Sequence, residues 1–268
     1  MIHTRRSTTR ILADAVASLS FTVEIKNVAD NGDGTYTLTT CDIYHAQAGF
    51  NVTIGGQSYK IESIEAPYIM VVSGNTYPPS SFFNLYTPAF FYGTPYATDI
   101  DLKQEASANV KTPMIWLLIP FNDRVYSDIE EIHDREITCK LYFLTQGNSN
   151  KWLTYQSYAN AVIPMQSLVD SFITKLRATP AIFDMTDVEY TAVDYPKFGV
   201  YITMKGVEKR LFADDLAGVE VSITLPIFRS PYCDDCPPES ADDYMLYEDY
   251  SEHVYQNGEP MLYQTVNV

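Results

Sequence analysis

The residues best suited to metal or redox chemistry are Cys233 and Cys236, which flank two aspartates. A Cys-x-x-Cys spacing is that of half a zinc site or of a redox dithiol. A closed zinc site needs four ligands, and His253 is the one further candidate near this pair. Pro237 and Pro238 exclude the helix that opens after a thioredoxin-type motif. We interpret the motif as a turn, and metal binding by the two cysteines stays an open alternative.

Acidic residues around one histidine form a second group, which could carry out acid–base chemistry. The group contains Asp128, Glu130, Glu131, His133 and Asp134, with Arg124 and Arg135 at its ends. Catalysis also needs a sheltered pocket and positioning groups. Because this charged segment lies between two expected strands, we interpret it as a solvated or subunit-facing loop. A hydrolase that uses Asp128, Glu131 and His133 is the alternative.

Two other patterns are similar to binding sites. Residues 30–34 (Asp-Asn-Gly-Asp-Gly) match part of a calcium loop but lack the alternating oxygen ligands and the distal glutamate, so they predict a hairpin turn with glycines at positive φ. Trp152 follows a turn and could offer a sugar a surface platform, whereas Trp116 lies in an apolar run and is expected in the core. The sequence therefore predicts no catalytic residue, no metal and no cofactor.

Composition narrows the class of protein. The chain has 268 residues, of which 46% are hydrophobic, and this predicts a folded protein of one or two domains. It carries 34 acidic and 18 basic residues, a formal charge of −16, so free nucleic acid is not an expected ligand. Four scattered cysteines indicate a reducing compartment. No apolar run approaches a membrane span, and we expect neither export by the ordinary route nor insertion into lipid.

The acidic charge is concentrated at the end of the chain. Residues 231–268 contain nine carboxylates and six tyrosines but no Lys or Arg. Such a segment repels itself when free yet offers aromatic rings for docking, so we expect an acidic C-terminal arm that orders against a partner. Near the other end, Arg5, Arg6 and Arg10 carry the opposite charge.

Hydrophobic spacing then predicts the elements of the N-terminal part. Residues 1–19 are expected to contain a short amphipathic helix. Residues 20–75 alternate apolar and polar side chains between Gly-containing turns, which predicts a small antiparallel β barrel or sandwich. Residues 76–100 are rich in proline and aromatic residues and almost uncharged. We expect this connecting segment to lie across a surface, such as that of another subunit.

Residues 101–230 predict an α+β domain. The apolar run 113–120 suits a strand buried on both faces, and residues 137–143 and 219–225 alternate as half-buried strands. Residues 198–204 predict a further strand. Pro164 is expected to open a helix, which ends at Thr179, with an apolar stripe on one face. The predicted fold class is thus α+β: a small β domain, an α+β domain and an extended C-terminal arm.

The segments 113–118, 137–144, 160–165 and 216–226 resemble structural proteins of tailed bacteriophages. The likeness is to the neck and tail-terminator-like group of phages that infect Bacteroides and relatives, including crAss-like phages. It implies a virion protein without catalytic residues, assembled in the host cytoplasm as a homo-oligomeric ring of six or twelve subunits at the head–tail junction. Expected partners are other neck, portal or tail proteins, and DNA passes through without sequence-specific binding. The alternative is a carbohydrate- or partner-binding module of a tail or cell-surface apparatus.

Overall fold

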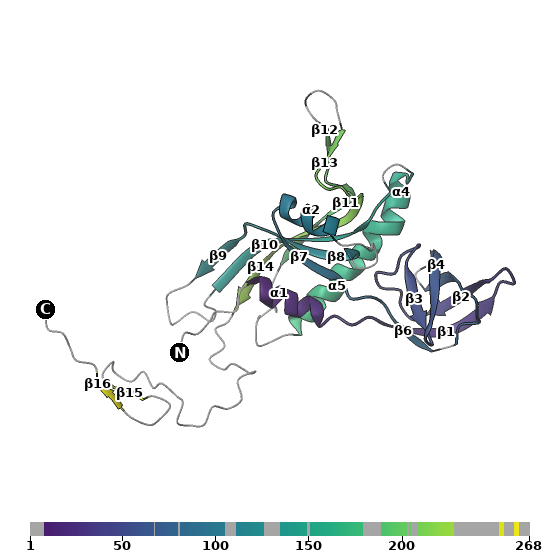
Figure 1. Ribbon diagram of the computed structural model, residues 1–268, viewed down its shortest axis with the longest axis horizontal. Helices are drawn as coiled ribbons and strands as arrows, with labels where there is room; N and C mark the ends of the chain where they lie inside the picture. The colour runs from purple at the N-terminus through teal and green to yellow at the C-terminus, as the bar shows by residue number, and fades with distance from the viewer. Residues whose placement is uncertain are drawn as a thin grey trace. The chain divides into compact units, whose positions relative to one another are not determined.

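The computed structural model describes residues 8–66, 68–79, 81–104, 111–125, 135–148, 151–178, 189–202, 204, 208–227, 252–254 and 260–262. Figure 1 shows its helices and strands. The chain divides into two compact units, Met1–Phe228 and Arg229–Val268. The first unit contains a β barrel, a mixed sheet and the helices, so the predicted α+β class is confirmed. In the second unit, β15 (Glu252–Val254) pairs antiparallel with β16 (Pro260–Leu262).

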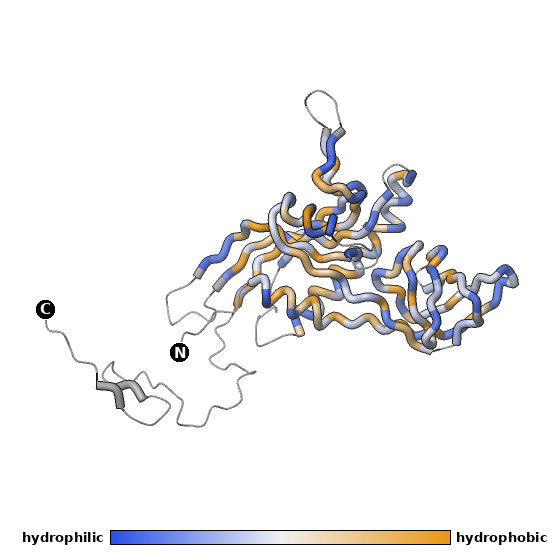
Figure 2. The backbone as a smooth tube through the Cα atoms, in the orientation of Figure 1, coloured by the Kyte–Doolittle hydropathy of each residue, from blue (hydrophilic) through white to orange (hydrophobic). Residues whose placement is uncertain are grey.

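Six antiparallel strands close into a barrel in the order β1-β2-β5-β4-β3-β6. The strands are β1 (Thr22–Asp30), β2 (Thr35–Thr40), β3 (Asn51–Ile54), β4 (Gln57–Ala66), β5 (Ile69–Ser73) and β6 (Phe82–Asn84). Val23, Leu38 and Ile54 are fully or almost fully buried, because successive side chains of a strand point to opposite faces. Figure 2 shows this alternation along the barrel strands. The predicted β domain is therefore a barrel, and its last strand lies beyond residue 75.

The turn between β1 and β2 is the predicted hairpin. Gly32 and Gly34 have φ angles of 79° and 82°, which favour glycine. Asp30 Oδ1 accepts a hydrogen bond from the Gly32 N–H at 2.8 Å, and Asp33 Oδ1 accepts one from the Thr35 N–H at 3.0 Å. Both carboxylates thus stabilise the turn itself. Within the described part of the chain, no group of acidic, His or Cys side chains is arranged to hold a metal.

The second sheet has the order β11-β14-β10-β8-β7, with β9 paired to β10 beside β8. Its strands are β7 (Ala89–Gly93), β8 (Met114–Leu118), β9 (Asn122–Val125), β10 (Arg135–Gln146), β11 (Tyr190–Phe198) and β14 (Leu216–Ile227). β10 and β14 pair antiparallel along their whole length, whereas β7 runs parallel to β8. Consequently β7 and β11 are the outermost strands of this order, and among the described residues β9 pairs on one side only as well. The predicted strand 198–204 is wrong as one element, because Gly199 (φ 70°) separates β11 from β12 (Val200–Ile202), which pairs with β13 (Glu208–Arg210).

Three helical segments of the described residues pack on the sheet. They are α1 (Thr8–Ala17), α2 (Pro95–Gln104) and a continuous helix made of α4 (Thr154–Ser157), the π-helical turn η1 (Tyr158–Val162) and α5 (Ile163–Arg177). Pro164 lies in the first turn of α5, as predicted, but the helical backbone begins earlier, with α4 and η1. Proline has no N–H to donate within a helix. The π turn immediately before it, in which the Ile163 N–H donates to Tyr158 O, lets the helix continue past this residue.

Hydrophobic side chains form two cores, one for each face of the sheet. The larger core joins the barrel, α1, α5 and one sheet face, with Leu12, Phe143 and Phe172 fully buried. The smaller core lies on the face that carries α2 and contains Trp116 and Tyr142. The predicted core position of Trp116 is confirmed. Of the helices that the structure describes, none is long and apolar enough to cross a membrane.

The connecting segment 76–100 differs from its prediction. It supplies β6 to the barrel, β7 to the sheet and the first half of α2, so much of it packs within its own chain. A five-residue aromatic strand can occupy the edge of a sheet, because a proline before an edge strand is tolerated. The prediction from composition did not consider this possibility. Several of its rings are nevertheless exposed, namely Tyr77, Phe82, Tyr86, Tyr92 and Tyr96.

Candidate functional site

The edge strand β7 leaves backbone groups unpaired. Its sequence, Ala-Phe-Phe-Tyr-Gly, has no charge. The Ala89 N–H donates to Pro113 O at 3.0 Å and Gly93 O accepts from the Ile119 N–H at 3.1 Å, so residues 89, 91 and 93 pair toward β8. The N–H and C=O groups of Phe90 and Tyr92 therefore point to the open side. Among the described residues, no backbone pairs with them there.

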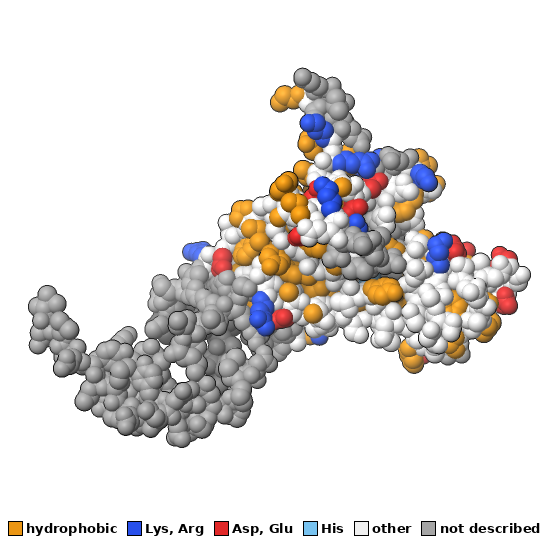
Figure 3. Space-filling view, in the orientation of Figure 1, with side chains coloured by type: hydrophobic (Ala, Val, Ile, Leu, Met, Phe, Trp, Pro, Cys, Tyr) orange, Lys and Arg blue, Asp and Glu red, His pale blue; other side chains and the backbone are white. Residues whose placement is uncertain are grey.

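Apolar side chains surround this edge. The Phe90 and Tyr92 rings lie 6.2 Å apart on one face of β7, and the Tyr92 side chain is 55% exposed. Figure 3 shows hydrophobic side chains gathered at the surface over β7 and α2. A flat, apolar, uncharged edge is a template for another strand, and proteins that do not use such an edge protect it with charge, proline or a bulge. β7 therefore has the properties of a strand-pairing surface.

The Trp116 side chain, which belongs to the smaller core, helps to hold β7 in place. Its indole Nε1–H donates to Gly93 O at 3.2 Å, and its ring stacks on Tyr142 with centroids 4.8 Å apart. Phe198 and Phe212 meet the same indole edge-on. Such aromatic pairs add about 0.5–1.5 kcal/mol each beyond burial. The indole therefore fixes the C-terminal end of the edge strand, where a partner strand would need a rigid template.

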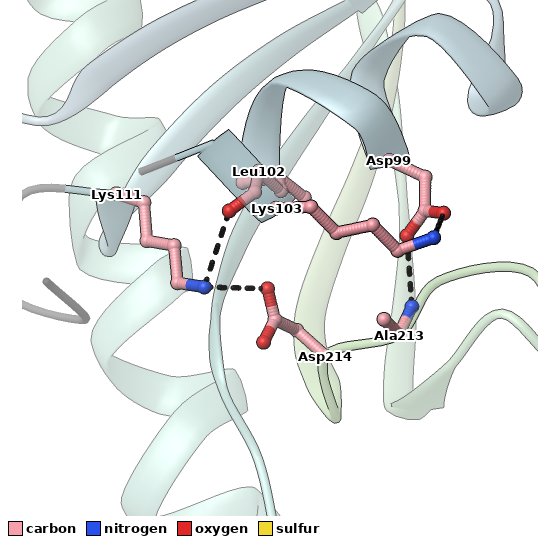
Figure 4. Close-up of polar contacts among 6 residues, drawn as sticks. All are labelled: Asp99, Leu102, Lys103, Lys111, Ala213 and Asp214. Carbon is pink, nitrogen blue, oxygen red and sulfur yellow. Dashed lines mark hydrogen bonds and ion pairs between the residues drawn. The ribbon is translucent and has the colours of Figure 1, made fainter. Parts of the chain in front are cut away.

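One hydrogen bond and one ion pair fasten α2 and the segment before β8 to the loop that leads into β14, as Figure 4 shows. A second ion pair, between Asp99 and Lys103, lies within α2. Asp99 accepts from the Ala213 N–H at 2.8 Å and from the Lys103 ammonium group. Burial by itself would raise the pKa of Asp99, but these hydrogen bonds outweigh it and lower the pKa. Lys111 Nζ binds Asp214 at 2.8 Å and the Leu102 carbonyl at 3.3 Å. The contacts hold the smaller core closed beside β7.

The opposite edge of the sheet is positioned by Glu220, a carboxylate on β14 that is only 6% exposed. It accepts hydrogen bonds from Lys140 Nζ at 2.6 Å and from the Tyr195 hydroxyl of β11 at 3.1 Å. Burial would raise the pKa of Glu220, but the hydrogen bonds from Lys140, Tyr195 and Tyr142 lower it. Burial is also the main reason why the pKa of Tyr142 is raised. Since every member of the cluster has a partner, its arrangement favours a structural role that fixes β11 to the sheet.

A third polar group lies where the barrel meets the sheet. His45 Nε2 bonds to Tyr86 O at 3.0 Å, and its ring meets Phe21 edge-on at 4.3 Å. Burial lowers the pKa of His45 to about 4. Nearby in sequence, Gln47 Oε1 accepts from the buried Thr145 hydroxyl of β10 at 2.6 Å. These bonds tie the loop between β2 and β3 to the sheet and to the strand connection after β6.

The predicted site residues are distributed as follows. The segment 126–134, and with it the proposed acid–base group, lies outside the described residues, as do Cys233 and Cys236. Both predictions therefore stay untested by the described residues. Trp152, the predicted platform, is half-buried, and the neighbouring Tyr155 side chain is more exposed.

Sequence reasoning missed both sheet edges and the Glu220 cluster. The uncharged run in β7 was visible, but its place at an edge depends on the parallel pairing with β8. Lys140 and Tyr142 share one face of their strand, and Glu220 and Ser222 share one face of theirs, so the sequence marked a polar face on each. It did not show that these strands are neighbours. A glutamate between apolar residues in a predicted strand was the available signal.

Comparison with known proteins yields no relative. No protein family, no curated protein and no solved structure matches the chain.

Proposed function

We propose that this chain is a structural subunit that assembles into a homo-oligomeric ring at the head–tail junction of a tailed bacteriophage. It would act as a neck protein, tail terminator or adaptor, with six or twelve copies around a channel through which DNA passes. The proposal joins the resemblance of residues 113–226 to phage neck and tail-terminator-like proteins with the two open edges of the sheet. No catalytic activity is part of it.

The observation that carries the proposal is that β7 and β11 are opposite edges of one sheet. If β7 of one copy pairs with the first part of β11 in the next, Tyr190–Val193, which precedes the charged residues, the proline and the register irregularity of that strand, each copy uses two different surfaces. Such head-to-tail contacts form a closed ring when the rotation between copies closes. Strand addition supplies main-chain hydrogen bonds, and the exposed side chains of Tyr92 and Val193 supply contacts beside them.

Charge supports the passage of DNA. With 34 acidic against 18 basic residues, the subunit repels phosphate on average, so DNA would not adhere to an acidic channel wall. The acidic segment 231–268 and the arginines at positions 5, 6 and 10 carry opposite charges. We propose that the arm contacts neighbouring neck, portal or tail proteins, a role that deletion of residues 231–268 would abolish without loss of the ring itself.

The experiment is a measurement of particle mass and symmetry by mass photometry and negative-stain microscopy. Wild type should form rings, while Tyr92→Lys on β7 and Val193→Lys on β11 should each prevent closure, because a lysine at an edge opposes strand pairing. Tyr68→Lys, at an exposed barrel position of similar exposure, is the control and should assemble normally.

A mixture of the two edge variants sharpens the test. Tyr92→Lys keeps an intact β11 and Val193→Lys keeps an intact β7, so the mixed proteins should form heterodimers and nothing larger. A wild-type protein that stays monomeric at every concentration would refute the ring. Rings that form equally well with both edge variants would refute the edge contact.

A further inference from the structure

The outer surface of the barrel carries a groove that the ring proposal does not use. It has a volume of about 500 Å³ and is lined by Thr53 and by residues 82–87, which comprise β6 and the residues after it. This volume falls in the range of small-molecule sites, roughly 300–1,000 Å³. The groove lies on the barrel, whereas the two open edges belong to the other sheet.

Two aromatic rings stand along this groove. Phe82 is 61% exposed and Tyr86 is 50% exposed, whereas the intervening Phe83 and Leu85 point into the barrel and are buried. Strand periodicity places the Phe82 ring on the outer face of β6, and Tyr86, two residues after the strand ends, lines the same groove. Four residues of extended chain separate their Cα atoms by about 13 Å. This distance exceeds the width of one pyranose ring, so the two platforms would contact different rings of an oligosaccharide.

Polar groups without charge lie between the rings. Asn84 is midway along the row, and its Oδ1 accepts a hydrogen bond from the Thr22 hydroxyl at 2.8 Å. That bond orients the amide and leaves its NH₂ group without a partner in the described part of the chain. Thr53 of β3 is paired directly with Asn84, so a hydroxyl flanks the amide on the other side. The groove therefore offers donors and acceptors across three adjacent strands.

The combination identifies the chemistry of the ligand. Sugar rings have apolar C–H faces that stack on aromatic side chains, and hydroxyl groups that bond to amides and hydroxyls. The lining has neither a basic residue to bind a phosphate or carboxylate nor an acidic one to bind a cation. We propose that the groove along β6 is a binding site for a neutral oligosaccharide, with Phe82 and Tyr86 as stacking platforms and Asn84 as the central hydrogen-bonding residue.

The site is tested on the full-length protein by saturation-transfer NMR and calorimetry with four neutral probes: cellotriose, maltotriose, mannotriose and triacetylchitotriose. At least one should bind saturably at millimolar concentration. Phe82→Ala and Tyr86→Ala should each weaken that binding about tenfold, and the double variant should abolish it. Phe82→Trp should retain it. Tyr96→Ala removes a still more exposed ring on α2 and should leave binding unchanged.

Three outcomes would overturn the site. They are the failure of all four probes to bind, binding that survives in the double variant, and loss of binding in Tyr96→Ala. If Phe82→Ala and Tyr86→Ala instead reduce the mass of the assembled particle, the groove is an interface between copies. That fourth outcome would also overturn the sugar site. The three binding results do not bear on ring formation by wild type, so the sugar site and the ring can fail separately.

Discussion

Acidification should destabilise this fold through His45, whose side chain is only 2% exposed. In the folded protein its Nε2–H donates to Tyr86 O, and Nδ1 has no partner within the described residues. Protonation would place a positive charge and an unsatisfied N–H at Nδ1, next to the Phe21 ring. Burial therefore lowers the pKa of His45 from 6.5 to about 4, and the opposing hydrogen bond to the Tyr86 carbonyl is the weaker effect.

The sign and size of the change in stability follow from the difference between the ordinary pKa of histidine and the pKa of His45 in the folded protein. Between pH 6.5 and about 4 the unfolded chain binds a proton at this histidine that the folded chain does not bind. The contribution to stability is complete above pH 6.5 and is lost as the pH falls through about 4. At about 1.4 kcal/mol per pKa unit, the free energy of unfolding should fall by about 3 kcal/mol across this window.

The assay is urea denaturation at pH values from 7.5 to 4, followed by the fluorescence of the two tryptophans, of which Trp116 is buried. The matched variant is His45→Gln, because a glutamine amide can still donate to the Tyr86 carbonyl but does not titrate. Carboxylates such as Glu220 also affect stability in acid, but they are common to both proteins and cancel in the difference. Wild type should lose about 3 kcal/mol more than the variant.

Two results would refute this reasoning. If the stability profiles of wild type and His45→Gln run parallel, the histidine does not couple folding to pH. If NMR shows that the imidazole of the native protein titrates near its ordinary value, the ring is not buried as the structure has it.

Three further predictions concern the sheet. Gly218→Ala should lower the free energy of unfolding by about 3 kcal/mol or more in chemical denaturation, because a Cβ there would lie 1.9 Å from Phe143 O on the paired strand. A change below about 1 kcal/mol would contradict that contact. Glu220→Ala should cost about 2 kcal/mol, since it removes a charge-assisted hydrogen bond to Lys140, and unchanged stability would mean that the cluster is solvated. Burial raises the pKa of the Cys139 thiol to about 12, so this thiol should react with a thiol reagent only in urea. The label is located by peptide mass spectrometry, because Cys41 is exposed and reacts in the native protein, and rapid native labelling at Cys139 would show that β10 is exposed.

Local patterns were enough to predict most of the elements. The alternation of apolar residues in β1 and β10 and the stripe on α5 match the observed buried faces, because periodicity reflects which side of an element is buried. The turn at residues 30–34 was predictable because Asp and Gly side-chain chemistry acts over two or three residues. The α+β class follows from these elements alone.

The pairing of strands that are distant in the sequence could not be predicted. Nothing near Phe82 or Phe90 in the sequence shows that one lies in a barrel strand and the other in the edge of a different sheet. Pro164 suggested a helix start, but the π turn before it, together with the buried stripe on both sides, allowed the helix to continue. In the first case the deciding contacts are with residues far away in the chain, whereas the π turn before Pro164 is a local feature that the proline did not reveal.

The sequence by itself determined the composition of the faces: which positions are apolar, where the chain turns, and that charge accumulates at its end. Only the tertiary structure decided which of those faces stay open, because exposure at β7, β11 and β6 depends on which strands happen to be neighbours. Side-chain periodicity is a property of a few consecutive residues, whereas an edge or a groove exists only once distant strands have paired. The edges β7 and β11 proposed for assembly and the groove along β6 proposed for sugar binding therefore exist only in the tertiary structure.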